Sequence, residues 1–259
     1  MAELFKKICR LAGTAVTDHN MIGENDHILI GVSGGKDSKV LVEVLHHLQK
    51  TAPVRFTLST ATFDPAFEGF SSEETEKFCW QYDMEHHTIR FDIASLLEEK
   101  NLTGKPCMLC SRMRRGNLYS LARKLGANKL ALGQHLDDIC ISFLMSLCRG
   151  SGLSTMGPNV PAESGDLRVI RPLIYVPEEL IRNYAEERAY AVSGECIYKE
   201  QLIREGDRPY FARLLEELSA RIPDLRSNML RSLSNIQASH LLDRKFTQTL
   251  FTDSKEPDK

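Results

Sequence analysis

Apolar residues follow two patterns along this chain. Some form short uninterrupted runs, and others recur every three or four residues over longer stretches. The short runs predict buried strands, and the longer stretches predict amphipathic helices. The predicted strands cover residues 27–32, 54–63, 86–91, 129–133 and 167–170. The predicted helices between them cover residues 40–48, 71–82, 111–125, 136–148 and 177–188.

Strands that alternate with helices of this length predict a parallel sheet covered by helices on both faces. With right-handed crossovers the fold class is α/β, a doubly wound, mainly parallel five-stranded sheet that binds ligands at the carboxyl ends of its strands. Residues 151–166, rich in Gly, Pro, Ser and Asn, predict a loop. The expected units are an N-terminal helical segment, an α/β domain and a C-terminal helical extension, at residues 1–25, 26–200 and 201–259.

The amino-acid composition limits the possible location of the protein and the kinds of partner it can bind. The chain has 259 residues, of which 42% are hydrophobic and 26% charged, as in ordinary globular proteins. Because no apolar run reaches the roughly 18–20 residues that cross a bilayer, and no secretory signal is visible, we expect a cytoplasmic protein without membrane contact. The odd number of cysteines, seven, fits a reducing compartment. The net charge of −2 means that a polyanionic partner would need a local basic patch.

The first predicted strand runs into a glycine-rich loop, SGGKDS at residues 33–38. Gly34 and Gly35 would let the backbone approach a phosphate and adopt positive φ, and the next helix offers free N–H groups to an anion. Ser33 and Ser38 can donate hydrogen bonds, and Lys36 supplies a positive charge. The alternative is a turn that merely connects strand to helix.

Asp37 distinguishes this loop from a Walker loop, which carries Ser or Thr there, and a carboxylate beside phosphates suits metal binding. SGGKDS after a strand resembles the PP-loop ATPase superfamily. The resemblance implies cleavage of ATP between its α- and β-phosphates, with adenylation of a substrate oxygen and release of pyrophosphate. The expected ATP contacts are Ser33, Gly34, Gly35, Lys36, Ser38, Phe63 and Gly133.

A second acidic motif, LGQHLDD, places Asp137 and Asp138 just beyond the fourth predicted strand. In a PP-loop fold this edge faces the same crevice as SGGKDS. We therefore expect these carboxylates, with Asp37, to hold the Mg²⁺ that organises the triphosphate. The alternative is that they only cap the helix that begins there. The expected catalytic residues are Lys36, Asp37, Asp137 and Arg114.

Cys107 and Cys110 form a CxxC pair in KPCMLCSRMRRG, a spacing that lets two thiolates reach one metal or cluster. A redox dithiol and two structural cysteines are the alternatives. No second CxxC is present, and Cys196 in SGECIYKEQ is the best third ligand for a 4Fe–4S cluster. The cysteines predicted to be buried thiols are Cys9, Cys79, Cys140 and Cys148.

SGGKDS, CxxCSRxRRG, LGxHxDD and RPL occur in the order that resembles the tRNA 2-thiocytidine synthetase group, from about residue 5 to 246. The resemblance implies a dimer that binds ATP and magnesium, carries a 4Fe–4S cluster on three cysteines and replaces the 2-oxo group of a tRNA cytidine by sulfur. It implies Cys107 and Cys110 as cluster ligands. The chain departs from the group in lacking a second PCxxC-like pair near Cys196. It also has Gln134 where the group has a histidine.

Three arginines lie directly beside the CxxC. On a helix Arg112 and Arg115 share a face, whereas Arg114 points elsewhere. These groups could bind RNA phosphate or stabilise an adenylated intermediate, and a solvated helix face is the alternative. We assign Arg112 and Arg115 to RNA. A second basic candidate, diluted by acids, comprises Arg204, Arg208, Arg213, Arg221, Arg226, Arg231 and Arg244.

The motifs together predict ATP-dependent, iron–sulfur-dependent 2-thiolation of a tRNA cytidine through an adenylated base. The expected partners are tRNA, a cysteine desulfurase or other sulfide donor, and a second copy of the chain. Three alternatives stay open: thiolation of another nucleobase or a small molecule, a lysidine synthetase-like amine or amide ligase, and a non-catalytic nucleotide and metal sensor.

Overall fold

A computed structural model describes residues 2–67, 70–99, 106–162, 165–190 and 206–244, apart from a few side chains in α4 and the first turn of α5. The strands are β1 (Asp26–Gly31), β2 (Phe56–Asp64), β3 (Glu85–Arg90), β4 (Lys129–Ala131), β5 (Asn159–Pro161) and β6 (Arg168–Ile170). The helices up to the sheet's last strand are α1 (Ala2–Asp18), α2 (Lys36–Thr51), α3 (Glu73–Trp80), α4 (Ile93–Glu99), α5 (Pro106–Lys124) and α6 (Leu136–Cys148). They are followed by α7 (Glu178–Glu187), α9 (Asp207–Ser219), α10 (Leu225–Ser234) and a 3₁₀ turn at Ala238–His240.

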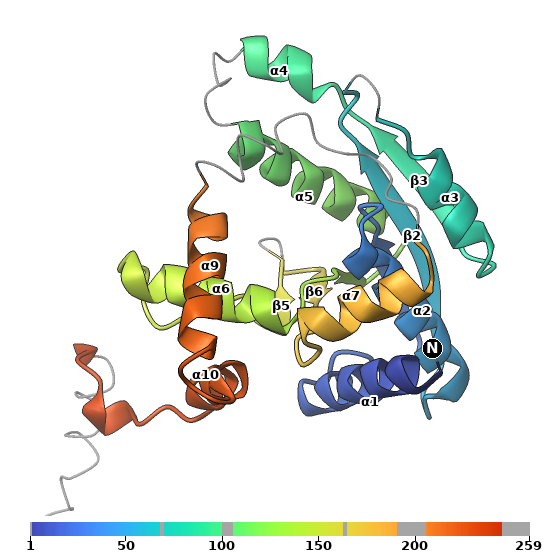
Figure 1. The fold of residues 1–259 in the computed structure, drawn as a ribbon. Helices are drawn as coiled ribbons and strands as arrows, with labels where there is room; N and C mark the ends of the chain where they lie inside the picture. Colours follow the sequence, from blue (N-terminus) through green and yellow to red (C-terminus); the bar gives the residue numbers. More distant parts are fainter. Residues whose placement is uncertain (1, 68–69, 100–105, 163–164, 191–205, 245–259) are drawn as a thin grey trace, which may run out of the picture.

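The strands form one sheet of order β3-β2-β1-β4-β6-β5, parallel except for β5 (Figure 1). The predicted doubly wound, mainly parallel sheet is confirmed, but it has six strands where five were predicted. The additional strand, β5, lies in the segment predicted to be a loop. Because it is only three residues long, it has no alternating pattern that the sequence could reveal. It ends in Pro161, which is tolerated in an edge strand.

Helices cover both faces of the sheet, and the strand alternation divides the core between them. Ile28 and Ile30 of β1 face a cluster that includes buried side chains of α1, α2 and α7. Leu29, between them, faces the opposite side, where Leu118 and Ala122 of α5 pack. The central strand is therefore buried on both sides, as expected for a parallel sheet.

The C-terminal helices lie away from the sheet and pack on α6 (Figure 1). Phe211 and Leu215 of α9 and Met229 of α10 are buried against apolar residues of α6. The helical pattern of the sequence continues past residue 234, but α10 ends at Ser234. Ile236 is 60% exposed, so no packing supports a longer helix there.

Helices α4 and α5 differ from the predicted pattern. Helix α5 starts at Pro106 rather than at residue 111, so the CxxC lies within its first turns. Proline is favoured at the first helical position, where its missing N–H is not needed. Helix α4 has no counterpart in the predicted pattern. Within the described residues no helix has the length and apolar content needed to cross a bilayer.

Candidate functional site

The glycine-rich loop lies between the end of β1 and the first turn of α2. Gly34 has a φ of +81°, which favours glycine, whereas Gly35 has a φ of −77°. The predicted need for positive φ therefore applies to Gly34 alone. No side chain caps α2, which leaves its first N–H groups directed at the loop and available to an anion.

Ser38 stabilises the loop from within. Its hydroxyl donates to the Gly35 carbonyl at 2.9 Å and accepts the Ser33 N–H at 3.1 Å. The Ser38 residue is only 4% exposed, whereas Ser33 is exposed. Of the two predicted hydroxyl contacts to phosphate, Ser33 is thus the accessible one.

Gly133, at the end of β4, is required by a close approach of two backbone segments. A Cβ atom there would lie 3.1 Å from the carbonyl carbon and oxygen of Asp37 and 3.2 Å from the Ser38 nitrogen. Such contacts are tighter than a side chain normally tolerates. Gly133, an expected ATP contact, lines the cavity beside the loop, and its missing side chain makes room for the first turn of α2.

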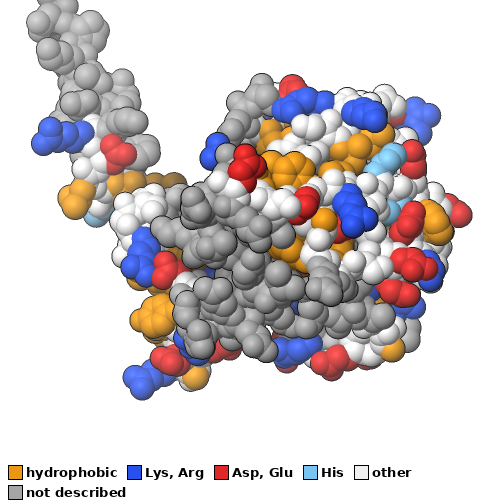
Figure 2. All heavy atoms as spheres, turned by 90° about the horizontal axis from the view of Figure 1, so that it is seen from above, with side chains coloured by type: hydrophobic (Ala, Val, Ile, Leu, Met, Phe, Trp, Pro, Cys, Tyr) orange, Lys and Arg blue, Asp and Glu red, His pale blue; other side chains and the backbone are white. Residues whose placement is uncertain are grey.

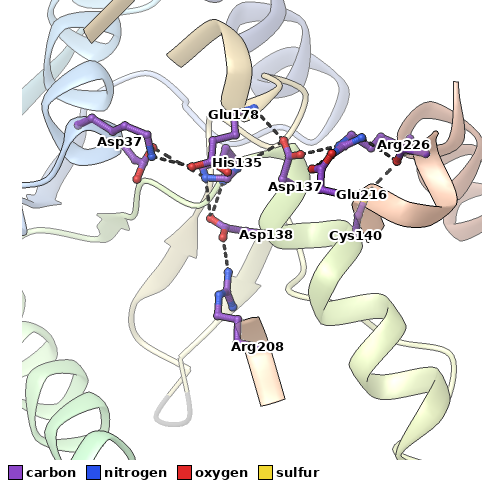
Figure 3. Close-up of polar contacts among 11 residues, drawn as sticks. Asp37, His135, Asp137, Asp138, Cys140, Glu178, Arg208, Glu216 and Arg226 are labelled. Carbon is purple, nitrogen blue, oxygen red and sulfur yellow. Dashed lines mark hydrogen bonds and ion pairs between the residues drawn. The ribbon is translucent and has the colours of Figure 1, made fainter. Parts of the chain in front are cut away.

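Charged groups gather where α2, α6 and α7 begin (Figure 3). Lys36 Nζ lies 2.8 Å from Glu178 Oε1 and 3.0 Å from Asp37 Oδ1. Burial works to lower the pKa of Lys36, but Glu178 and Asp37 outweigh it and raise the pKa above its usual value. Burial acts to raise the pKa of Glu178, yet its hydrogen bond with Lys36 holds it below the usual range. Lys36 is therefore charged in this site, with a carboxylate on either side.

Asp37, His135 and Glu178 form a group that could hold a cation, because one ligand atom of each lies within 4.8 Å of the others. Asp37 Oδ1 and His135 Nδ1 are buried and lack a partner with hydrogen-bond geometry. Such orphaned polar atoms fit a ligand that supplies the missing interaction. Sequence reasoning missed Glu178. Its only local signal was its place as an acid at the first position of a helix, directly after Pro177.

The two aspartates of the second acidic motif have different surroundings (Figure 3). Asp138 Oδ2 accepts the His135 backbone N–H at 3.1 Å, and Arg208 of α9 pairs with Oδ1. Asp137 Oδ2 accepts the Glu178 N–H at 2.7 Å, and Arg226 Nε of α10 lies 2.5 Å from Oδ1. Asp137 thus joins α6, α7 and α10, while Asp138 caps α6 and contacts α9.

Arg208 and Arg226 belong to the C-terminal arginines that the sequence suggested as a basic surface. In the structure they neutralise the acidic motif instead. Their pairing with Asp137 and Asp138 joins residues far apart in the chain, for which no spacing rule exists. The C-terminal helices therefore contribute directly to the site.

A cavity of about 320 Å³ opens beside the loop. It brings together the loop, the acidic motif, α5 and α9, which supply Ser33, Asp37, Ser38, Gly133, Asp138, Cys110, Arg114 and Arg208. Apolar side chains, including Phe63 and Phe67, form another wall. The cavity thus joins anion-binding groups to an apolar surface that suits a base.

The cysteines fall into three groups. Cys110 is partly exposed and lines the cavity, whereas the Cys107 side chain and all of Cys196 lie outside the described parts. Cys9, Cys79 and Cys140 are buried, and burial raises their pKa to about 12, 11 and 12. These three match the predicted buried thiols. Cys148 is exposed, so that prediction was wrong for it.

The arginines of α5 separate as the helical period predicts. Arg114 shares the cavity with Cys110, one turn earlier on the same face. Arg112 and Arg115 line a second cavity on another side of α5. One helix thus presents arginines to two distinct spaces.

Comparisons with known proteins agree with this architecture. A PP-loop domain family matches residues 7–192. A tRNA-cytidine(32) 2-sulfurtransferase of Syntrophotalea carbinolica is 39% identical over 93% of this chain and 93% of the relative. The enzyme of the same name from Azotobacter vinelandii is 38% identical over 98% of this chain and 94% of the relative. The solved structure of the U34-tRNA thiolase NcsA from Methanococcus maripaludis, with its [4Fe-4S] cluster, has a TM-score of 0.71 at 23% identity, covering 91% of this chain and 80% of that one. This last likeness shows a shared fold.

Proposed function

The chain belongs to the PP-loop proteins and, within them, to the tRNA-cytidine(32) 2-sulfurtransferase family, and we propose that it uses ATP to replace the 2-oxo group of a tRNA cytidine by sulfur. One observation on the structure supports this function independently of the family resemblance. Asp37 of the phosphate loop and Cys110 of the CxxC line the same cavity. An adenylating group and a thiolate are thereby brought to one reaction space.

ATP fits the loop side of the cavity. The open first turn of α2, Ser33 and the charged Lys36 suit the phosphates, and Phe63 suits the adenine side of the apolar wall. Asp37 has a buried oxygen without a hydrogen-bond partner, and Asp138 lines the same cavity, so we assign Mg²⁺ to these two carboxylates. When bound, Mg²⁺ neutralises charge that develops on the phosphates. We assign Asp137 to holding the acidic motif in place, because it is not among the residues that line the cavity and its two oxygens contact α7 and α10.

Cys110, which lines the cavity, would supply one thiolate ligand to an iron–sulfur cluster there. We assign Cys110, Cys107 and Cys196 as its ligands, of which Cys110 faces the cavity. Three thiolates would hold a 4Fe–4S cluster with one iron left available to a sulfur species. Arg114, beside Cys110, places a guanidinium next to the reaction space.

The proposed reaction has two substitutions. The cytidine 2-oxygen attacks the α-phosphorus of ATP, and the bond to the β-phosphate oxygen breaks as pyrophosphate leaves. Hydrosulfide from the sulfide donor then attacks C2, the C–O bond breaks as AMP leaves with the oxygen, and the proton of the sulfur is lost. Lys36 stabilises charge on the phosphates, and Arg114 stabilises charge on the adenylated base. Adenylation is needed because an unmodified carbonyl oxygen is a poor leaving group.

The wider setting follows from this reaction. We propose a tRNA substrate, a cysteine desulfurase or another sulfide donor, a homodimer and a cytoplasmic location. We also retain residues 26–200 as the catalytic unit, flanked by the helical segments 1–25 and 201–259. The pairing of Arg208 and Arg226 with the acidic motif makes the last segment part of that unit's site.

One experiment tests both halves of the proposal. The protein is purified without oxygen and assayed for iron and sulfide, and tRNA nucleosides from deletion and complemented cells are compared by mass spectrometry. We expect a bound cluster and a 2-thiocytidine that disappears on deletion and returns on complementation. Unchanged thionucleosides would contradict the assignment of tRNA as the substrate. An active protein without iron would contradict the proposed need for a cluster.

A further inference from the structure

A second cavity, of about 830 Å³, lies between α5 and the edge of the sheet formed by β5 and β6. Among the described residues its lining includes three arginines, Arg112, Arg115 and Arg171, and no carboxylate. Tyr119 and Phe91 add aromatic surface. Seen from above the view of Figure 1, the described surface shows apolar side chains with both basic and acidic side chains around them (Figure 2).

Arg171, which directly follows β6, is the residue of this cavity whose surroundings most favour binding of an anion. Its guanidinium donates to Gln134 Oε1 at 3.1 Å and to the Gly157 carbonyl at 2.5 Å, and both acceptors are neutral. Among the described residues no carboxylate forms an ion pair with it. Burial lowers the pKa of Arg171, and the charge of Arg115 lowers it further. A half-buried cation with another cation beside it gains when an anion binds.

We propose that this cavity binds the tRNA strand next to the reacting nucleotide, with a phosphate at the three arginines and a neighbouring base on Tyr119. The inference rests on the proposed function and adds Arg171 and Tyr119 to the RNA contacts. Clustered arginines suit phosphate, and an aromatic ring suits an unstacked base of a single-stranded loop. An acidic peptide offers the charge but no base to stack.

The second cavity is joined to the first through one hydrogen bond. Gln134 lines the nucleotide cavity, Arg171 lines the second cavity, and the two side chains contact each other. Helix α5 also borders both spaces. RNA held in the second cavity would therefore lie beside the entrance to the reaction space, as a loop that delivers one base must.

The test measures tRNA affinity of the anaerobic, cluster-loaded full chain at several salt concentrations. We expect Arg112→Gln/Arg115→Gln and Arg171→Gln each to weaken binding about 10-fold and to reduce the salt slope by about 1 per phosphate contact. Tyr119→Ala should weaken binding about 5- to 10-fold, while Tyr119→Phe should bind as the wild type does because it keeps the ring. Arg182→Gln, an exposed arginine of α7, is the matched control.

The outcomes separate this inference from the proposed function. If wild-type protein binds and thiolates tRNA but the three sets of variants bind like Arg182→Gln, the second cavity is not the RNA site. If wild-type protein binds no tRNA, both proposals fail. Equal competition by poly-glutamate and by single-stranded RNA of the same charge, with Tyr119→Ala unaffected, would assign the cavity to acidic proteins and overturn the inference.

Discussion

Helix α2 carries two charged clusters about two turns apart, and they are built in opposite ways. At its start, Lys36 and Asp37 contact Glu178 at the edge of a cavity. Further along, Glu43 is buried within the helical layer, with a side chain only 5% exposed. In the first cluster Asp37 Oδ1 is buried and has an ion pair but no hydrogen-bond partner, whereas in the second both oxygens of the buried Glu43 carboxylate accept hydrogen bonds.

The Glu43 cluster is closed by phenols and a guanidinium. Tyr82 donates to Oε1 at 2.5 Å, Arg188 Nη2 donates to the same oxygen at 2.8 Å, and the Tyr184 hydroxyl donates to Oε2. Burial works to raise the pKa of Glu43, but these donors outweigh it and hold the pKa below its usual value. The four residues come from α2, α7 and the segments after α3 and α7, so the cluster ties that layer together.

The contrast between the two clusters distinguishes a buried charge that stabilises the fold from charges that are available to bind a ligand. Burial alone does not distinguish them, since both clusters lie partly or wholly within the protein. The distinguishing feature is whether the buried carboxylate oxygens accept hydrogen bonds. Asp37 Oδ1 does not, and Asp37 lines the nucleotide cavity.

The largest expected effect is on catalysis at the open cluster. Asp37→Asn keeps the size of the side chain but removes the proposed Mg²⁺ ligand. We expect tRNA-dependent pyrophosphate release to fall about 10³-fold, which is about 4 kcal/mol of barrier, with an unchanged free energy of unfolding. Glu179→Gln, an exposed acid on α7, is the control. If the Asp37→Asn variant lost stability but kept its rate of pyrophosphate release, Asp37 would have a structural role like that of Glu43.

At the closed cluster we expect the reverse. Glu43→Ala leaves a guanidinium and two phenols without their acceptor, which should lower the free energy of unfolding by about 3 kcal/mol. Urea denaturation measures this loss. Tyr184→Phe, which removes one hydroxyl, should cost about 1 kcal/mol. An unaltered denaturation midpoint for Glu43→Ala would contradict the structural role.

Asp137 offers an intermediate case that sharpens the comparison. It belongs to the acidic motif of the site, yet its two oxygens are satisfied, as those of Glu43 are. We expect Arg226→Gln to lower the free energy of unfolding by about 2 kcal/mol, less than a fully buried pair because Arg226 is 23% exposed. Denaturation and pyrophosphate release are measured together. A loss of rate without loss of stability would show that Arg226 acts on the substrate.

The smallest expected effect concerns acid. The pKa of Glu43 is lowered by folding from its ordinary value of 4.5, so its contribution is complete above that pH and is lost as the pH falls below it. Stability of the wild type should therefore fall more steeply below pH 4.5 than that of Glu43→Gln. Glu178 is shifted in the same direction but is 42% exposed, so Glu178→Gln should change the slope less. Equal slopes for all three proteins would contradict the contrast.

Local pattern predicted much of this molecule and failed at identifiable places. Five strands and the turn into α2 follow from apolar runs and glycines, whose effect acts within a few residues. β5 was missed because a three-residue edge strand carries no periodicity. The α10 extension was overpredicted because its apolar residues, Ile236 among them, find nothing to pack against.

The sequence by itself determined the phosphate loop, the acidic motif, the CxxC and the two arginine faces of α5, because each depends on residue type and short spacing. Only the tertiary structure decided which charges meet. It brought Glu178 to Lys36, Arg226 to Asp137 and Arg208 to Asp138. It also set Arg171 against Gln134 between two cavities. These pairings join residues distant in sequence through the packing of separate elements, and no local pattern encodes which of many similar arginines and acids will come together.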